Sequence, residues 1–316
     1  MDLENTTRFP ARLFRTAIDD DRLAASVAAR ITYDIRGGAL IESEEQAWPV
    51  SDAPWQSEYG ILDGDQLFYR GGVDVFLFGH ARPAKRDATT MRIITRVGAF
   101  TREMAVHGVR VWHKRVAGLA ATAPRPIGAI PLTMSHAYGG KDLWDGLEIA
   151  YPLNAEGMGF YLNEASAVDR PLPNLEEPDQ LITRWDDRPS PAGVMAYPPG
   201  APIRLAAMHR PGEGKPLITF DARMFNAAHP RMIAPAAPPG TLVEVEGVSP
   251  DGPITFALPP LPLRARIRFD AEEAVQPLLV DQIGIEPDKQ RVFLSYRFPF
   301  RYVVYPEQLR SCRLEA

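Results

Sequence analysis

The sequence predicts a mainly β protein: an antiparallel β-sandwich-like domain with a long irregular central insertion and few short helices. The 31 prolines amount to about twice the usual share, and proline breaks helix interiors, so long helices are disfavoured. Apolar and polar residues alternate in short runs in the first and last parts of the chain, as they do in half-buried strands. The middle of the chain has no sustained period of either kind, which predicts an insertion between two β-rich parts.

These patterns divide the 316 residues into three parts of one expected domain, residues 1–316. Residues 20–115 and 236–316 are β-rich, whereas residues 116–235 are irregular and loop-rich. No internal repeat occurs at a fixed period. One β-sandwich-like domain is therefore the favoured architecture, and two small β domains are the alternative.

The first β-rich part begins with a strand from Leu23 to Ile35, whose second half is rich in β-branched and aromatic residues. Gly37 and Gly38 predict a turn, and residues 39–42 can return as a hairpin partner. The chain then becomes polar and rich in turns, which predicts a surface loop before the next strands.

Four further strand-like runs follow, and glycines separate them. They are Val73–His80, Met91–Val97, Phe100–His107 and Val109–His113. Short strands in succession, punctuated by glycine, favour an antiparallel meander. In the polar segment before them, Trp48 and Trp55 are expected to pack that segment onto a sheet.

The last β-rich part opens with a hairpin. Val243 and Val245 face one way, and a turn at residues 249–252 leads to answering apolar positions at Ile254 and Phe256. Later strands are expected at residues 263–269, 277–285, 291–298 and 300–305, the second and third of them as a hairpin.

One of these strands places three arginines, Arg264, Arg266 and Arg268, on its outward face. Such a stripe suits a phosphate or an acidic partner. Pairing with Glu244 and Glu246 across a sheet face is the favoured interpretation.

Helices are expected only in the loop-rich part, as short turns at residues 203–210 and 220–228. The most distinctive segment there runs from Pro131 to Pro178 and is dense in glycine, proline, asparagine and aromatic residues. Its aromatic and apolar side chains can bury enough surface to offset the entropy of ordering, so we expect an ordered, multi-turn crossing. An irregular segment of this length inside a compact domain is usually functional or disordered.

Composition argues against several classes of protein. The formal net charge of −5 gives no sign of a nucleic-acid or anionic-membrane partner. The single cysteine, Cys312, excludes an intramolecular disulfide and a cysteine-rich zinc site. The sequence begins without a signal-peptide pattern and has no apolar run that could span a bilayer, so a cytoplasmic location is expected.

The sequence gives little indication of a catalytic nucleophile or of a metal site. His107 and His113 lie six residues apart, but no third ligand is indicated, so no metal site is expected. Ser135 and His136 are adjacent, but the small-residue elbow that exposes a nucleophilic serine is absent. Neither a Walker-type loop nor a G-x-G-x-x-G element is present in the sequence.

The best enzyme hypothesis is a glycosidase. Asp142, Asp145 and Glu148 are close enough in sequence to supply a pair of carboxylates, and Trp144 and Tyr151 offer rings on which a sugar could stack. Mixtures of acidic and aromatic residues are common in polar loops, so the glycosidase hypothesis is kept only as an alternative.

A series of short motifs along the chain is specific in its order and spacing. The motifs are Asp74-x-x-Leu77-x-Gly79-x-Ala81, Val97-Gly98, His107-Gly108-x-Arg110-x-Trp112, Pro131-Leu132, Ala137-Tyr138-Gly139-Gly140, Tyr151-Pro152-x-Asn154-x-x-Gly157-x-Gly159, Leu172-Pro173-Asn174-Leu175-Glu176, Phe225-Asn226-Ala227-Ala228, and Leu279 to Arg297 with Asp281. Over nearly its whole length the sequence resembles the bacterial family called domain of unknown function 2169.

The resemblance implies an adaptor or chaperone rather than an enzyme. Members of that family occur beside type VI secretion genes and are regarded as proteins that load toxic effectors onto the secretion spike, a VgrG trimer with its PAAR tip. The resemblance therefore implies an effector protein, the VgrG and PAAR spike proteins, or both as partners, with cytoplasmic action and no cofactor. A carbohydrate-binding protein or glycoside hydrolase using the acids of residues 142–148 is the alternative.

Two sets of candidate residues follow. The family-motif residues are expected to be structural, because glycine and asparagine tolerate positive φ and close backbone approach; they are Tyr138, Gly139, Gly140, Asn154, Gly157, Gly159, Pro173 and Asn174. The aromatic residues of the same stretch are expected to contact a partner; they are Trp144, Tyr151, Phe160 and Tyr161. No catalytic, cofactor-binding or metal-binding residue is expected.

Overall fold

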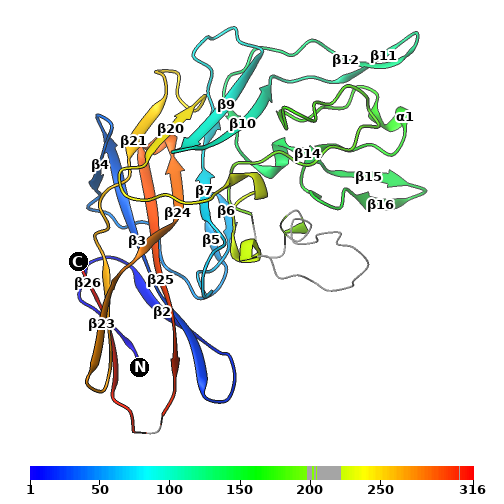
Figure 1. Ribbon diagram of the computed structural model, residues 1–316. Coiled ribbons are helices and arrows are strands. Elements are labelled where there is room, and N and C mark those ends of the chain that lie inside the picture. The colour runs from blue at the N-terminus through cyan, green and yellow to red at the C-terminus, as the bar shows by residue number, and fades with distance from the viewer. Residues whose placement is uncertain (198–200, 203, 205–221, 306) are drawn as a thin grey trace.

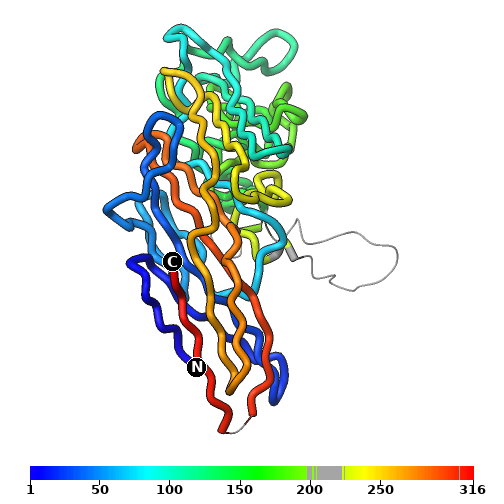
Figure 2. The backbone as a smooth tube through the Cα atoms, turned by 60° about the vertical axis from the view of Figure 1, so that its left-hand side comes forward, coloured from blue at the N-terminus to red at the C-terminus, as the bar shows by residue number. Residues whose placement is uncertain are grey.

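A computed structural model describes residues 1–197, 201–202, 204, 222–305 and 307–316. Within these residues the fold is mainly β, as the sequence predicts, and it has one short α-helix. The molecule is elongated, and strands from both ends of the chain run side by side along it (Figure 1; Figure 2).

A seven-stranded sheet forms the centre of the fold. In spatial order its strands are β19 (Ile233–Ala234), β7 (Val73–Leu77), β24 (Leu279–Glu286), β25 (Arg291–Val303), β3 (Arg22–Arg36) and β2 (Ala11–Ala17), with β4 (Ala39–Glu42) paired to β3 beside this path. The first predicted strand, its short hairpin partner and the predicted hairpin β24–β25 are confirmed. Residues 300–303 are not a separate strand, because β25 continues its pairing with β3 as far as Val303.

Two further sheets pack against the central one. The five-stranded sheet has the order β18 (Leu175–Glu176), β10 (Phe100–His107), β9 (Thr90–Val97), β20 (Leu242–Glu246) and β21 (Ile254–Ala257). The four-stranded sheet has the order β1 (Leu3–Asn5), β26 (Arg310–Glu315), β22 (Arg264–Phe269) and β23 (Glu272–Pro277). The predicted hairpin β20–β21 is confirmed, with Val243 opposite Phe256.

The other elements are short. The paired strands are β5 (Trp55–Ser57) with β6 (Gly60–Leu62), β8 (His80–Ala81) with β13 (Ile130–Pro131), β11 (Trp112–Arg115) with β12 (Gly118–Ala121), β14 (Tyr138–Gly139) with β17 (Met158–Gly159), and β15 (Lys141–Trp144) with β16 (Leu147–Ala150). The helices are α1 (Glu164–Ala167) and the 3-10 turns η1 (Met134–His136), η2 (Ala222–Phe225), η3 (Pro230–Met232) and η4 (Pro287–Lys289). The turn expected at residues 220–228 corresponds to η2, whereas the helix expected at residues 203–210 lies outside the described residues.

The predicted meander is wrong. β9 and β10 do pair as neighbours, but β7 pairs in parallel with β24, and β11 pairs with β12 outside the five-stranded sheet. Parallel pairing also joins β1 to β26, so the sheets are mixed rather than purely antiparallel. Glycines mark where strands end, but they carry no information on which strand lies alongside.

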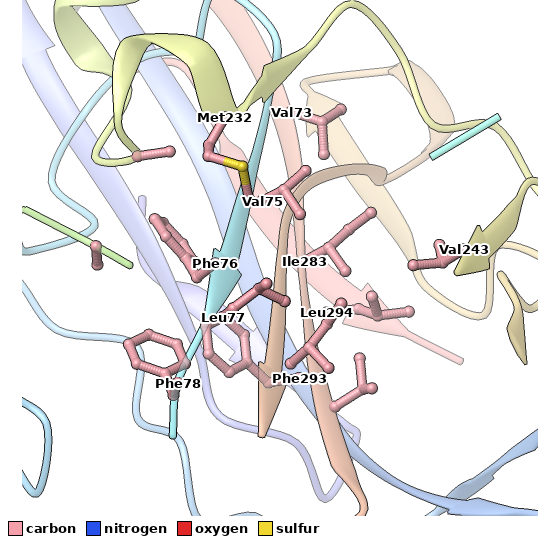
Figure 3. Packing of buried hydrophobic residues seen from close by; sticks show 14 of the residues in the cluster. Val73, Val75, Phe76, Leu77, Phe78, Met232, Val243, Ile283, Phe293 and Leu294 are labelled. Atoms are coloured by element: carbon pink, nitrogen blue, oxygen red, sulfur yellow. The ribbon is translucent and has the colours of Figure 1, made fainter. Parts of the chain in front are cut away.

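Residues of one face of the central sheet pack against the other two sheets in the main hydrophobic core. Val75, Ile283 and Leu294 lie in register across β7, β24 and β25, and Val243 of the five-stranded sheet packs in the same cluster (Figure 3). Ile267 of the four-stranded sheet joins this cluster as well. Residues from both β-rich parts of the chain therefore share one core.

The opposite face carries a buried network of charges. Arg30 donates to Asp65 at 2.7 Å and to Gln282 at 2.9 Å, and Arg70 pairs with Asp74 at 3.2 Å. All of these side chains are at least nine-tenths buried. Burial of a charge is costly unless it is paired, so this network fixes how the segment before β7 lies on the sheet.

The two tryptophans of that segment behave as expected. Trp48 is buried with its Nε1 donating to the carboxylate of Glu286 at 2.9 Å. Its ring lies 4.2 Å from that of Phe293 and meets Trp55 edge to face at 5.8 Å. The aromatic rings thus hold the loop against the sheet.

The predicted partners of the arginine stripe are wrong. Arg266 pairs with Glu273 and Glu315 on the neighbouring strands of its own sheet. Glu244 and Glu246 pair instead with an arginine of the adjacent β9. The reason is that β20 and β22 belong to different sheets, which the alternation of residues does not reveal.

Candidate functional site

The predicted crossing forms where two motif-bearing segments meet, at the parallel pair β14–β17. The carbonyl of Asn154 accepts a hydrogen bond from the Gly140 amide at 2.8 Å. The side-chain amide of Asn154 donates to the carbonyls of Met134 and Tyr138, at 2.8 and 3.1 Å. One buried asparagine therefore ties together backbone groups from two successive turns.

Three glycines allow this close approach. Gly139 has φ +148° and Gly140 has φ +106°. A Cβ atom on Gly139 would overlap the carbonyl oxygen of Asn154, and one on Gly140 would lie 2.6 Å from the carbonyl oxygen of Gly157. On Gly157 it would lie 2.6 Å from the carbonyl oxygen of Ala137. Backbone packed this tightly excludes any side chain at these positions.

The remaining motif residues continue the crossing into the next segment. A Cβ atom on Gly159 would lie 2.7 Å from Cδ of Pro173. Asn174 Oδ1 lies 2.8 Å from Nδ1 of His136, and its side-chain amide donates to the carbonyl of His107 at 2.9 Å. These contacts are all internal to the fold.

A second hydrophobic core lies beside the crossing. Its buried members are Trp112, Tyr138, Tyr151, Phe160, Tyr161, Ala167, Leu172 and Ile182. The rings of Tyr138 and Tyr151 meet edge to face at 4.8 Å, and Phe160 lies 5.5 Å from Tyr151. Three of the four aromatic residues expected to contact a partner, Tyr151, Phe160 and Tyr161, are thus at most 9% exposed and pack inside the protein.

The fourth, Trp144, lies on the hairpin β15–β16, which projects from the second core (Figure 1). Leu143, Trp144 and Leu147 are 64%, 58% and 66% exposed, and Ile149 is 38% exposed. Trp144 pairs with Leu147 across the two strands, and Ile149 follows Leu147 by two residues, so these three side chains lie on one face and Leu143 lies on the other. We call Trp144, Leu147 and Ile149 the apolar hairpin surface.

The hairpin turn consists of Asp145 and Gly146, with φ of +49° and +77°. Two successive positive φ values define the type I′ turn, whose twist matches that of the flanking strands. An Asp-Gly pair flanked by apolar residues is the strongest short-range signal for a hairpin. From the sequence these residues were expected to belong to a loop, so the hairpin was not predicted.

Asp142 anchors the base of this hairpin. Its carboxylate accepts hydrogen bonds from the Leu162 amide at 2.7 Å and from the Ser166 hydroxyl at 2.6 Å. Burial acts to raise the pKa of Asp142, but these hydrogen bonds outweigh it and hold the pKa below its usual value. The ionised carboxylate therefore ties β15 to α1, while the tip of the hairpin stays exposed.

The acids of the glycosidase hypothesis do not face one another across the hairpin. Asp142 is opposite Ile149 and Glu148 is opposite Leu143, so the two carboxylates lie on opposite faces of the two-stranded ribbon. Glu148 instead pairs with Lys141 at 2.7 Å. Asp142 and Glu148 thus each have a partner of their own.

The other candidate groups are likewise separated. Ser135 Oγ lies 2.8 Å from the hydroxyl of Thr133, whereas His136 is directed to Asn174. His113 lies 3.6 Å from a carboxylate oxygen of Asp169. Across the described residues, no group of three His, Cys, Asp or Glu side chains is placed to hold a metal ion.

Two consecutive glutamates, which were not among the predicted site residues, fix the end of the central stretch. Glu176 and Glu177 are 3% and 1% exposed. Glu176 pairs with Arg110, and Glu177 pairs with both Arg102 and Arg231. Acidic residues are seldom buried without partners, but the sequence alone does not show which arginines come to meet them.

The fold and site define a mainly β protein that holds an apolar hairpin in solvent on a tightly packed loop crossing. By sequence, the chain belongs to a bacterial family: the family profile described as "Uncharacterized protein conserved in bacteria (DUF2169)" matches residues 20–297. The resemblance seen in the motifs is thereby confirmed. Comparison with curated proteins gives no match, and comparison with solved structures gives none either.

Among the helices of the described residues, none has both the length and the apolar character needed to cross a bilayer.

Proposed function

We propose that this chain is a non-catalytic adaptor or chaperone that binds a toxic effector protein and helps to load it onto the type VI secretion spike. The observation that carries the proposal is the apolar hairpin surface, Trp144, Leu147 and Ile149. In this role the protein acts in the cytoplasm of the producing cell, and its partners are the effector, the VgrG and PAAR spike proteins, or both.

The exposure of these side chains has a physical meaning. Scattered apolar residues are normal on a protein surface, but a contiguous group is typical of an interaction site. Burying a large apolar side chain contributes roughly 1.5–3 kcal/mol, and tryptophan is enriched among the residues that dominate binding energy. Burial of these side chains by another protein would therefore contribute favourably to the free energy of binding.

The support beneath the hairpin favours binding as well. The anchor at Asp142 and the turn at Asp145 and Gly146 fix the hairpin before any partner arrives. A pre-ordered element loses less conformational entropy on association. The rigid crossing thus presents the hairpin, and the partner contacts come from the exposed side chains.

A carbohydrate-directed function is the second candidate, because Trp144 is an exposed ring. It is less favoured, since Asp142 and Glu148 lie on opposite faces of the hairpin and each is already paired. A retaining or inverting glycosidase needs two carboxyl groups facing one bond, roughly 5–9.5 Å apart.

Co-purification from the native operon tests the proposal. The tagged chain is expressed with all products of its adjacent genes, and the eluate is analysed by mass spectrometry and size-exclusion chromatography. We expect a stable complex with a neighbouring toxin or spike protein. Recovery of the chain alone, together with normal effector secretion after its deletion, would contradict the proposal. Binding on a glycan array that is lost in Trp144→Ala would favour the carbohydrate function instead.

A further inference from the structure

We propose that a cavity at the start of β7 and β24 binds a peptide segment of the partner protein, taking up one apolar side chain together with its adjacent amide. The inference rests on the proposed function in that the occupant comes from a protein partner. It concerns a different surface from the apolar hairpin, and it can be tested separately.

The cavity has the size and walls of a binding pocket. Its volume is about 440 Å³, within the range of roughly 300–1,000 Å³ seen for ligand sites. Four prolines, Pro235, Pro238, Pro239 and Pro299, line it together with Tyr69. Proline has no backbone N–H group and a fixed φ, so these walls are apolar and stiff, and they suit an apolar side chain.

Charged groups close one side of the cavity. Arg70, Asp281 and Arg297 line it, and each is at least nine-tenths buried. Val280 pairs with Tyr296 and Gln282 pairs with Ser295, which is adjacent to Tyr296 in β25. Asp281 is therefore the extra residue of a β-bulge. Bulges re-aim side chains and are over-represented next to functional sites.

Two polar atoms of this group are buried and form no hydrogen bond within the described residues, namely Nε of Arg70 and Oδ1 of Asp281. Arg70 Nε lies 3.3 Å from the other oxygen of the Asp281 carboxylate, in an ion pair. Arg297, in contrast, donates from Nε to Asp281 at 2.7 Å, and from Nη1 to the Ser26 hydroxyl and the Leu67 carbonyl, at 2.9 and 3.0 Å. An unsatisfied buried polar group costs about 1–3 kcal/mol, so a bound group that supplies both an acceptor and a donor would be stabilising.

The balance of charge selects a neutral group. The network beneath the cavity contains three arginines and three aspartates: Arg30, Arg70, Arg297, Asp65, Asp74 and Asp281. Their formal charges cancel. A carboxylate in the cavity would meet Asp281, and an ammonium group would meet Arg297. An amide has both an acceptor and a donor with no net charge, and every peptide segment supplies one beside each side chain.

The test uses small probes on the full-length protein, so that no partner is required. N-acetyl-leucinamide carries an apolar side chain between two amides, N-acetyl-leucine is its anionic counterpart, and leucinamide is its cationic counterpart. Binding is followed by heteronuclear NMR and by soaking crystals of the protein. We expect N-acetyl-leucinamide to occupy the cavity with millimolar affinity, and each charged probe to bind at least fivefold more weakly.

Two substitutions at the rim test the location. Ala236 is exposed and Leu279 is 59% exposed, and both line the cavity. Ala236→Trp fills the opening and Leu279→Asp makes it acidic, so both are expected to abolish binding of N-acetyl-leucinamide. Ala271→Trp and Leu309→Asp are matched controls at exposed positions outside the cavity and should bind as the wild type does. Unchanged melting temperatures of the rim variants would show that they fold.

Absence of binding, equal binding of all three probes, or binding that survives Ala236→Trp would overturn the inference. The proposed function fails by a different result, the absence of any complex from the native operon. If the complex forms with unchanged affinity in Ala236→Trp, the adaptor function stands and the role of the cavity in partner binding is refuted.

Discussion

Gly139 and Asn154 lie so close together that a Cβ atom on the glycine would overlap the backbone oxygen of the asparagine. This contact explains why the motif of the central stretch pairs a double glycine with an asparagine fifteen residues later in the sequence. The crossing is a piece of packed backbone, and its role is to hold the hairpin that follows it.

Gly139→Ala is expected to lower the free energy of unfolding by about 3 kcal/mol or more, because overlap with backbone is added to strain at positive φ. Gly37→Ala is the control: Gly37 also has positive φ (+58°), but its Cβ would have no neighbour within 4 Å. That variant should lose only about 1–2 kcal/mol. Urea unfolding of both proteins measures the difference, and equal losses would show that the crossing tolerates a side chain.

Asp142→Asn is expected to loosen the hairpin without unfolding the protein. The variant keeps the shape of the side chain but removes the charge that the Leu162 amide and the Ser166 hydroxyl stabilise. The pKa of Asp142 lies below its usual value, so this stabilisation is present above the unfolded pKa and is lost as pH falls through the folded pKa. Hydrogen exchange of the Leu162 amide should become faster at pH 7; equally slow exchange would rule out the anchor.

Glu177→Gln is expected to destabilise the fold by roughly 3–5 kcal/mol, because it leaves the buried end of Arg102 and the side chain of Arg231 without their shared carboxylate. Glu148→Gln removes an exposed pair with Lys141 and should change stability by about 1 kcal/mol or less. Thermal and urea unfolding provide the comparison. A small effect of Glu177→Gln would mean that the buried pairs contribute little to the fold.

His229 should make the protein sensitive to mild acid. It is 3% exposed, its Nδ1 accepts the Arg231 amide at 3.0 Å, and burial lowers its pKa to about 3. The unfolded chain takes up a proton near pH 6.5 while the folded protein does not, so this contribution to stability is complete above pH 6.5 and is lost as pH falls toward 3. Between pH 7 and pH 5 the loss is about 2 kcal/mol.

His229→Gln separates this effect from other titrations. The variant should be less stable at pH 7, yet its free energy of unfolding should fall less between pH 7 and pH 5 than that of the wild type. Parallel stability curves for the two proteins would show that His229 is not the group responsible.

Periodicity predicted the strands well where one face is apolar. Val243 and Val245 on β20 are fully buried, as their alternation indicated, and the hairpin β24–β25 formed where expected. Pairing between distant strands was beyond reach: Val75 lies beside Ile283 in parallel register, and no local feature of either strand specifies the other. Mixed sheets and the partners of the arginine stripe were missed for the same reason.

The candidate site was predicted in part. The motif glycines and Asn154 were expected to be structural, and their contacts lie within the fold. Composition did not separate the buried rings of Tyr151 and Phe160 from the exposed ring of Trp144, because an aromatic residue suits a core and an interface equally. The Asp145-Gly146 turn was the available signal that would have placed Trp144 on an exposed hairpin.

The most direct test of the central claim is the affinity of the co-purified partner for a hairpin variant. The double variant Trp144→Ala/Leu147→Ala removes two exposed side chains from the apolar hairpin surface. The expected loss of binding free energy is roughly 3 kcal/mol, which corresponds to binding at least about 100-fold weaker. Isothermal titration calorimetry measures this affinity. Leu309→Ala, at another exposed leucine, should bind within twofold of the wild type. Equal affinities of wild type and double variant, with unchanged melting temperatures, would contradict the account.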